Sequence, residues 1–122
     1  MKGKTPIHRS FAFALAGLFY FLRTQRHARI HVRAAIVVFV AAAWLHVSRQ
    51  DWAILILTVS LVLSLEAVNT AIEAAVDLAS PQIHPLAKVA KDVAAAAVLI
   101  SAIGAVAIGV FILGPPLLAR FR

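Results

Sequence analysis

The stretch Trp52–Leu65 carries no charged residue, and three carboxylates follow it at helical spacing, at Glu66, Glu73 and Asp77. Hydrophobic residues make up 62% of the 122-residue chain, far more than a soluble globular protein contains. We therefore expect an integral membrane protein in which a stripe of carboxylates begins inside the membrane and ends in water.

Long apolar segments separated by short polar turns indicate an all-α membrane protein. The segments expected to span the membrane cover about residues 30–49, 52–77 and 85–113. Pro81 and Pro85 interrupt the helix between the last two segments, and Pro85 can begin the final helix. Gly114-Pro115-Pro116 is expected to end that helix. We interpret residues 1–122 as a single membrane-embedded domain.

The N-terminal apolar segment, Phe11–Leu22, follows basic residues and so imitates a signal peptide. No small-residue cleavage site follows it, and a helix of this length rises only about 18 Å, too short for a hydrocarbon core of roughly 30 Å. We expect an amphipathic helix over about residues 6–28 that lies at the membrane surface. Its lipid-facing stripe would consist of Phe11, Leu15, Leu18 and Leu22.

Basic residues give the chain a formal net charge of +7. They flank the apolar segments, which favours binding to anionic lipid head groups, so we expect no nucleic-acid partner. Most Lys and Arg residues lie before the first span or in the second loop, and the exceptions are Arg49, Arg120 and Arg122. This asymmetry predicts a cytoplasmic N-terminus and a cytoplasmic loop between Asp77 and Asp92. The absence of Cys excludes disulfides and thiolate metal sites.

Five polar residues of the second span project from one side of a helix, within an arc of roughly 100°: Glu66, Asn69, Thr70, Glu73 and Asp77. Counting about 20 residues of hydrocarbon from the start of the span places Glu66 roughly 8 Å inside the membrane. Glu73 then lies at the boundary and Asp77 outside it. A carboxylate at the depth of Glu66 can act as a base toward a lipid hydroxyl.

The hydrated end of the stripe has the composition of a phosphate site. Glu73 and Asp77 can hold Mg²⁺, which is typically bound through one or two carboxylates together with substrate phosphates. Lys91 adds a cation for phosphate, and Asp92 adds a further acid. These residues predict a place where a lipid hydroxyl meets a metal-bound phosphate.

Other functions fit parts of this pattern. Polar residues in a membrane can serve only to join helices, although intramembrane ionisable groups usually mark a functional site. A proton- or cation-coupled transport subunit also uses a membrane-embedded Glu, but the polar residues that continue toward the far side are only Thr58, Ser60 and Ser64. His27 and His31 have the spacing of metal ligands on a helix, and we interpret them instead as polar groups facing lipid.

The residues Glu66-x-x-Asn69-x-x-x-Glu73-x-x-x-Asp77, followed by Lys91-Asp92, resemble the signature of the bacterial integral-membrane diacylglycerol kinase family. The resemblance covers most of Glu66–Leu99, and weaker patterns at Arg29–His31 and in the N-terminal helix extend it along the chain. The segment Ser80–Lys88 is more similar to the undecaprenol kinase branch of the family than to the diacylglycerol branch.

The resemblance implies a homotrimer in the bacterial inner (plasma) membrane. Each subunit would have three transmembrane helices and a surface helix, with the active site facing the cytoplasm. The reaction would transfer the γ-phosphate of Mg-ATP to a membrane lipid alcohol, with undecaprenol favoured over diacylglycerol. The resemblance makes Glu66 the catalytic base beside the lipid substrate and Glu73 a metal ligand. The residues implied in nucleotide and phosphate binding are Asn69, Glu73, Asp77, His84, Lys91 and Asp92.

One position departs from the family pattern. An acidic residue that joins in metal binding usually precedes the Arg-Ile-His motif, whereas this chain has Gln25 four residues before Arg29. An amide oxygen can still ligate Mg²⁺, but it brings no negative charge. Metal binding should be weaker as a result, or another acid must substitute, which keeps open a catalytically weak family member or a silent assembly protein.

Overall fold

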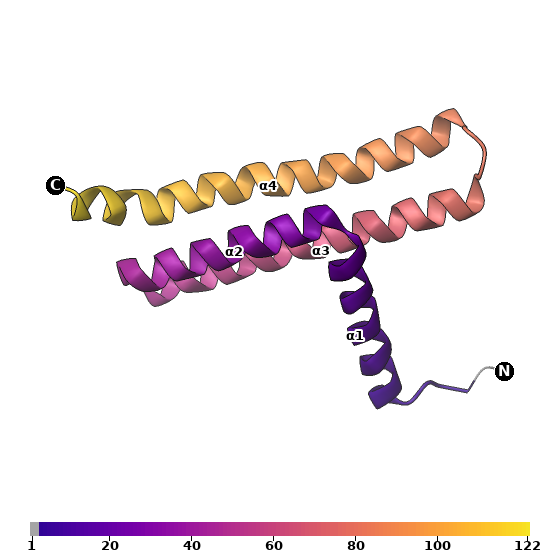
Figure 1. Ribbon diagram of the computed structural model, residues 1–122, viewed down its shortest axis with the longest axis horizontal. Coiled ribbons are helices and arrows are strands. Elements are labelled where there is room, and N and C mark those ends of the chain that lie inside the picture. Colours follow the sequence, from indigo (N-terminus) through magenta and orange to yellow (C-terminus); the bar gives the residue numbers. More distant parts are fainter. Residues whose placement is uncertain (1–2) are drawn as a thin grey trace.

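A computed structural model describes residues 3–122, and this part of the chain forms four α-helices and no strand (Figure 1). In chain order these are α1 (Ile7–Thr24), α2 (Arg26–Leu45), α3 (Arg49–Ala79) and α4 (Pro85–Arg120). α2, α3 and α4 run side by side, and α1 leaves this bundle at a steep angle (Figure 1). The all-α fold predicted from the sequence is confirmed.

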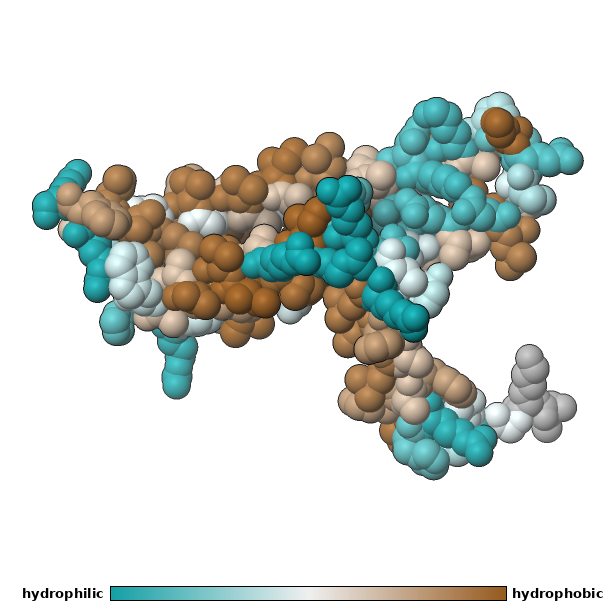
Figure 2. All heavy atoms as spheres, in the orientation of Figure 1, coloured by the Kyte–Doolittle hydropathy of each residue, from teal (hydrophilic) through white to brown (hydrophobic). Residues whose placement is uncertain are grey.

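Within residues 3–122, α2, α3 and α4 are each long and apolar enough to cross a membrane. Figure 2 shows apolar side chains along much of the bundle and hydrophilic side chains at its two ends and where α1 joins α2. α3 has 31 residues and therefore rises about 45 Å, well beyond a hydrocarbon core of roughly 30 Å. Its acidic C-terminal part can thus emerge into water while its middle crosses the membrane.

The helices pack through apolar residues at seven-residue intervals. On α2, Ala28, Ala35 and Ala42 are buried, and on α3, Leu55 and Val62 are buried. A seven-residue repeat keeps one face of a helix turned toward its partner along its length. The short alanine side chains allow α2 to approach its neighbours closely, which fixes the face of α2 that meets the rest of the bundle.

A sharp elbow joins α1 to α2, and it lies earlier in the chain than expected. The surface helix predicted over about residues 6–28 ends at Thr24, because Gln25 adopts an extended backbone with φ of −102° and ψ of 111°. The Arg29 guanidinium donates to the carbonyl oxygens of Leu22 and Arg23 at 3.2 and 2.7 Å. These carbonyls at the end of α1 have no partner further along their own helix, so Arg29 caps α1 from α2.

α1 contacts the bundle through its C-terminal half, where Phe21 is buried. The apolar side chains nearer its N-terminus are exposed in the protein, among them Phe11, Leu15 and Leu18. This exposure is what a helix with one face in lipid requires. The location of α1 at the membrane surface stays a prediction.

α4 continues to Arg120, so the prediction that Gly114-Pro115-Pro116 ends the last helix is wrong. Proline has a helical φ and removes one backbone hydrogen bond, and membrane helices tolerate it more readily than soluble ones. The extension brings the Arg120 guanidinium over the ring of Trp44, 4.3 Å from the centroid. This cation–π contact gives a structural reason for a basic residue at this end of the bundle, since most Lys and Arg residues lie at the other end.

Candidate active site

Burial along α3 changes in the direction that the sequence pattern suggests. Glu66 is only 5% exposed, although its side chain is ionisable. Glu73 is half-buried and Asp77 is exposed. At a rise of 1.5 Å per residue, the backbones of Glu66 and Asp77 are about 16 Å apart along the helix axis. Along α3, the acidic side chains therefore change from buried at Glu66 to half-buried at Glu73 and exposed at Asp77.

His31 of α2 contacts the enclosed carboxylate. Its Nε2 lies 3.2 Å from Oε1 of Glu66. The interpretation of His31 as a lipid-facing group is therefore wrong. His31 lies three residues after Ala28 and four before Ala35, so it shares the face of α2 that is buried in the bundle. That repeat of alanines was the signal in the sequence that could have placed His31 on the buried face of α2.

Asn69 links the middle of the stripe. Its Nδ2 donates to Oε1 of Glu73 at 3.4 Å, and Thr70 Oγ1 donates to the main-chain oxygen of Glu66 at 3.0 Å. Asn69 Oδ1 is buried and has no hydrogen-bond partner within residues 3–122. A buried amide oxygen without a partner costs free energy unless a donor or a cation binds it. The Asn69–Glu73 pair thus joins a carboxylate to an amide whose oxygen has no hydrogen-bond partner within residues 3–122.

Oxygen donors of this kind suit Mg²⁺, which prefers carboxylate and carbonyl ligands and completes its shell with water and phosphate. In the described part of the chain, no three His, Asp or Glu side chains are arranged so that they could hold a metal ion by themselves. That substrate phosphates complete the metal shell stays a prediction from the sequence. Gln25 lies at the α1–α2 elbow, where its Nε2 donates to Thr24 Oγ1 at 3.4 Å. Within residues 3–122 no hydrogen bond joins Gln25 to Glu73.

The polar end of α3 meets the start of α4 through one ion pair, and a second ion pair lies within α4. Asp77 of α3 pairs with Lys91 of α4, and Asp92 pairs with Lys88 one turn earlier. These charges line an open cleft with an empty volume of about 700 Å³, to which the loop at Ser80–His84 also contributes. Lys88 was not among the predicted site residues, although its i, i+4 spacing from Asp92 could have indicated it.

His84 has a local structural role at this cleft. It caps α4, because its Nδ1 accepts a hydrogen bond from the Leu86 amide at 3.1 Å, and Pro85 is the first residue of the helix. The prediction that Pro85 begins this helix is confirmed. Together, the cap and the ion pairs hold four side chains around one opening: His84, Asp77, Lys91 and Asp92. Glu66 lies earlier in α3, inside the bundle.

Comparison with known proteins shows which family this chain resembles. Residues 12–113 match the family described as prokaryotic diacylglycerol kinase. The chain is 50% identical to a diacylglycerol kinase of Synechocystis over 111 residues, which cover 90% of this chain and 63% of that protein. This chain therefore spans less than two thirds of that relative.

Two further relatives are covered over most of their length. An undecaprenol kinase of Bacillus subtilis is 40% identical over 109 residues, which cover 89% of each protein. A diacylglycerol kinase of Pseudomonas aeruginosa is 38% identical over 99 residues, which cover 79% of this chain and 80% of the relative. By these matches, the chain belongs to the prokaryotic diacylglycerol kinase family, a family of lipid kinases.

Proposed function

We propose that this protein transfers the γ-phosphate of Mg-ATP to the hydroxyl group of a membrane lipid alcohol, with undecaprenol as the first candidate acceptor and diacylglycerol as the second. The observation that carries the proposal is the graded series of acids on α3. Glu66 is enclosed in an apolar bundle, Glu73 is held by Asn69, and Asp77 lies at an open charged cleft. A lipid hydroxyl and a water-soluble phosphate donor can approach such a series from opposite ends.

Glu66 is the proposed base. The acceptor oxygen forms a bond to the γ-phosphorus, the bond from that phosphorus to the bridging oxygen of ADP breaks, and the hydroxyl proton passes to the Glu66 carboxylate. A group at the polar end of α3 would be too far from the hydrocarbon to do this. The near-complete enclosure of Glu66 also keeps competing water away from the reacting oxygen.

The cleft at the start of α4 is the proposed nucleotide and phosphate site. Lys91 supplies positive charge for phosphate oxygens, and its pairing with Asp77 holds it between α3 and α4. Asp92 and His84 line the same cleft. Bound Mg²⁺ would neutralise phosphate charge, and Glu73 and Asn69 are the residues proposed to hold it. Gln25 is a weaker candidate ligand because its amide brings no charge.

The structure gives a reason to prefer this function to proton or cation transport. A transport path would continue from Glu66 through polar groups toward the other end of α3. Thr58 is one of the few such groups, and its hydroxyl donates to the Ile54 carbonyl of its own helix at 2.7 Å. A hydroxyl used in this way offers little to a path between helices, which supports the kinase proposal.

We also propose a homotrimer, with the charged cleft on the cytoplasmic side of the plasma membrane. The glycines of α4 support self-association, because a Cβ added to Gly104, Gly109 or Gly114 would meet no atom within 4 Å in the single chain. Small residues that their own chain does not need for packing are suited to close contact with a neighbouring helix in lipid. The mass of the protein in detergent tests the assembly, and a mass of one chain would exclude it.

A lipid phosphorylation assay tests the proposed reaction. The protein in lipid, supplied with labelled ATP and Mg²⁺, should label undecaprenol or diacylglycerol when each is offered alone, and the faster acceptor identifies the branch. Triacylglycerol, which has no free hydroxyl group, serves as the blank. If neither alcohol becomes labelled above this blank, the kinase function is wrong for this chain.

A further inference from the structure

The Glu66 carboxylate is held from a second helix by a residue to which the reaction has so far given no role. His31 of α2 places Nε2 at 3.2 Å from Oε1 of Glu66, which lies on α3. Of the three close contacts between acidic and basic side chains in residues 3–122, this one lies deepest in the bundle, since the other two join exposed side chains. The contact therefore connects two membrane-spanning helices at the proposed base itself.

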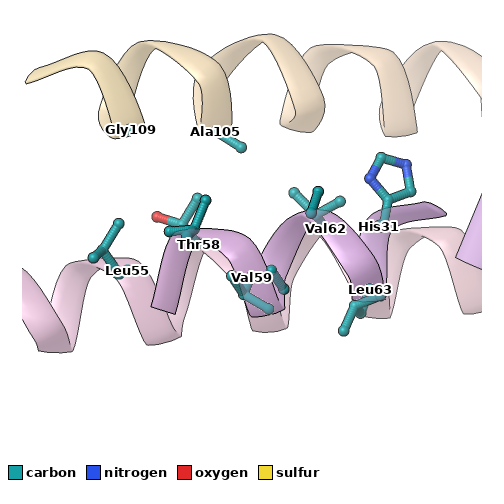
Figure 3. Close-up of a pocket in the computed structure, with 11 residues that line it drawn as sticks. His31, Leu55, Thr58, Val59, Val62, Leu63, Ala105 and Gly109 are labelled. Atoms are coloured by element: carbon teal, nitrogen blue, oxygen red, sulfur yellow. The ribbon is translucent and has the colours of Figure 1, made fainter. Parts of the chain in front are cut away.

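On the side of His31, this contact borders an apolar cavity. His31 points into the space between α4 and the pair α2–α3, on the same side as Val62, as Figure 3 shows. The cavity there has an empty volume of about 490 Å³ and is lined mainly by aliphatic residues. A glutamate side chain that has no polar partner can adopt several rotamers, and these direct its carboxylate toward different places. A polar partner that comes from another helix selects among them.

We propose that His31 is a positioning residue, whose imidazole holds the Glu66 carboxylate in the orientation that receives the proton of the lipid hydroxyl. This inference rests on the proposed kinase function and on the role of Glu66 in it. His31 needs no contact with ATP, because the nucleotide cleft is formed by the ends of α3 and α4 and does not include it. Its loss should therefore affect the chemical step and spare nucleotide binding.

Substitution at His31 gives the kinetic test. His31→Leu should lower kcat by roughly 10- to 100-fold, the usual effect of removing a group that orients a functional ligand, with the KM for Mg-ATP unchanged. His31→Gln keeps a neutral donor near the carboxylate and should recover part of the loss. His27→Leu is the matched control, because His27 lies one turn earlier on α2 and is exposed. Its kcat should stay at that of the unmodified protein.

A double-mutant comparison separates positioning from an independent role. If His31 acts through Glu66, adding His31→Leu to Glu66→Gln should cause no further loss of kcat. A loss that multiplies with that of Glu66→Gln would overturn the proposal, because it would place the effect of His31 outside this carboxylate. Retention of full kcat by His31→Leu in an active enzyme would overturn it as well.

The contact can also be measured without turnover. In protein labelled with ¹⁵N at histidine and reconstituted in lipid, Glu66→Gln should shift the imidazole resonances of His31 and leave those of His27 in place. Unmoved His31 resonances would show that the contact is absent, whatever the enzyme does. Conversely, a shifted His31 in a protein that labels neither lipid alcohol would confirm the contact, while the kinase function and the positioning role would both fail.

Discussion

Glu66→Gln should lower kcat for lipid phosphorylation by about 10²- to 10⁴-fold, the range over which a general base contributes. The amide has nearly the shape of the carboxylate but does not accept the hydroxyl proton. The KM for Mg-ATP should change little, because Glu66 lies inside the bundle and not at the charged cleft. The measurement is initial rate against ATP concentration at a saturating concentration of the preferred acceptor.

Asp51→Asn is the matched control for this variant. It makes the same carboxylate-to-amide change on the same helix, but in the first turn of α3, at the opposite end from the site. Its kcat should equal that of the unmodified protein. If Glu66→Gln kept full turnover, the role of Glu66 would be confined to helix packing, and the acid that accepts the proton would have to be sought elsewhere on the stripe.

Glu73→Gln should raise the Mg²⁺ concentration needed for half-maximal activity by at least the roughly 10- to 100-fold that groups supporting a metal site contribute. Glu73 is half-buried and receives a hydrogen bond from Asn69, so its carboxylate is already oriented. An amide at this position loses the negative charge that attracts the cation. Activity should return toward normal at high Mg²⁺, which a damaged fold would not allow.

Gln25→Glu provides the opposite change, because it adds a carboxylate where the sequence has an amide. If Gln25 reaches the metal, this variant should lower the Mg²⁺ requirement, and an unchanged titration would place Gln25 outside the metal site. The hydrogen bond of its side chain to Thr24 at the α1–α2 elbow is the competing structural role. For Glu73, a Mg²⁺ titration that coincides with that of the unmodified protein would contradict its assignment as a ligand.

The elements that the sequence predicted well are those fixed by local chemistry. The charge-free run before Glu66 and the helix start at Pro85 both depend on residues close together in the chain. Two boundaries were wrong for identifiable reasons. The break at Gln25 has no Gly or Pro to mark it and is stabilised by Arg29 from the following helix. Pro115 and Pro116 indicated a helix end, but α4 tolerates both prolines and continues to Arg120.

By itself the sequence determined that the chain has membrane-spanning helices and that Glu66, Asn69, Glu73 and Asp77 share one side of α3, because helical periodicity fixes how side chains are arranged around a single axis. Periodicity does not determine which faces of separate helices meet. That depends on how the helices rotate and approach one another, which the buried alanines of α2 decide. Only the tertiary structure could therefore bring His31 to the Glu66 carboxylate.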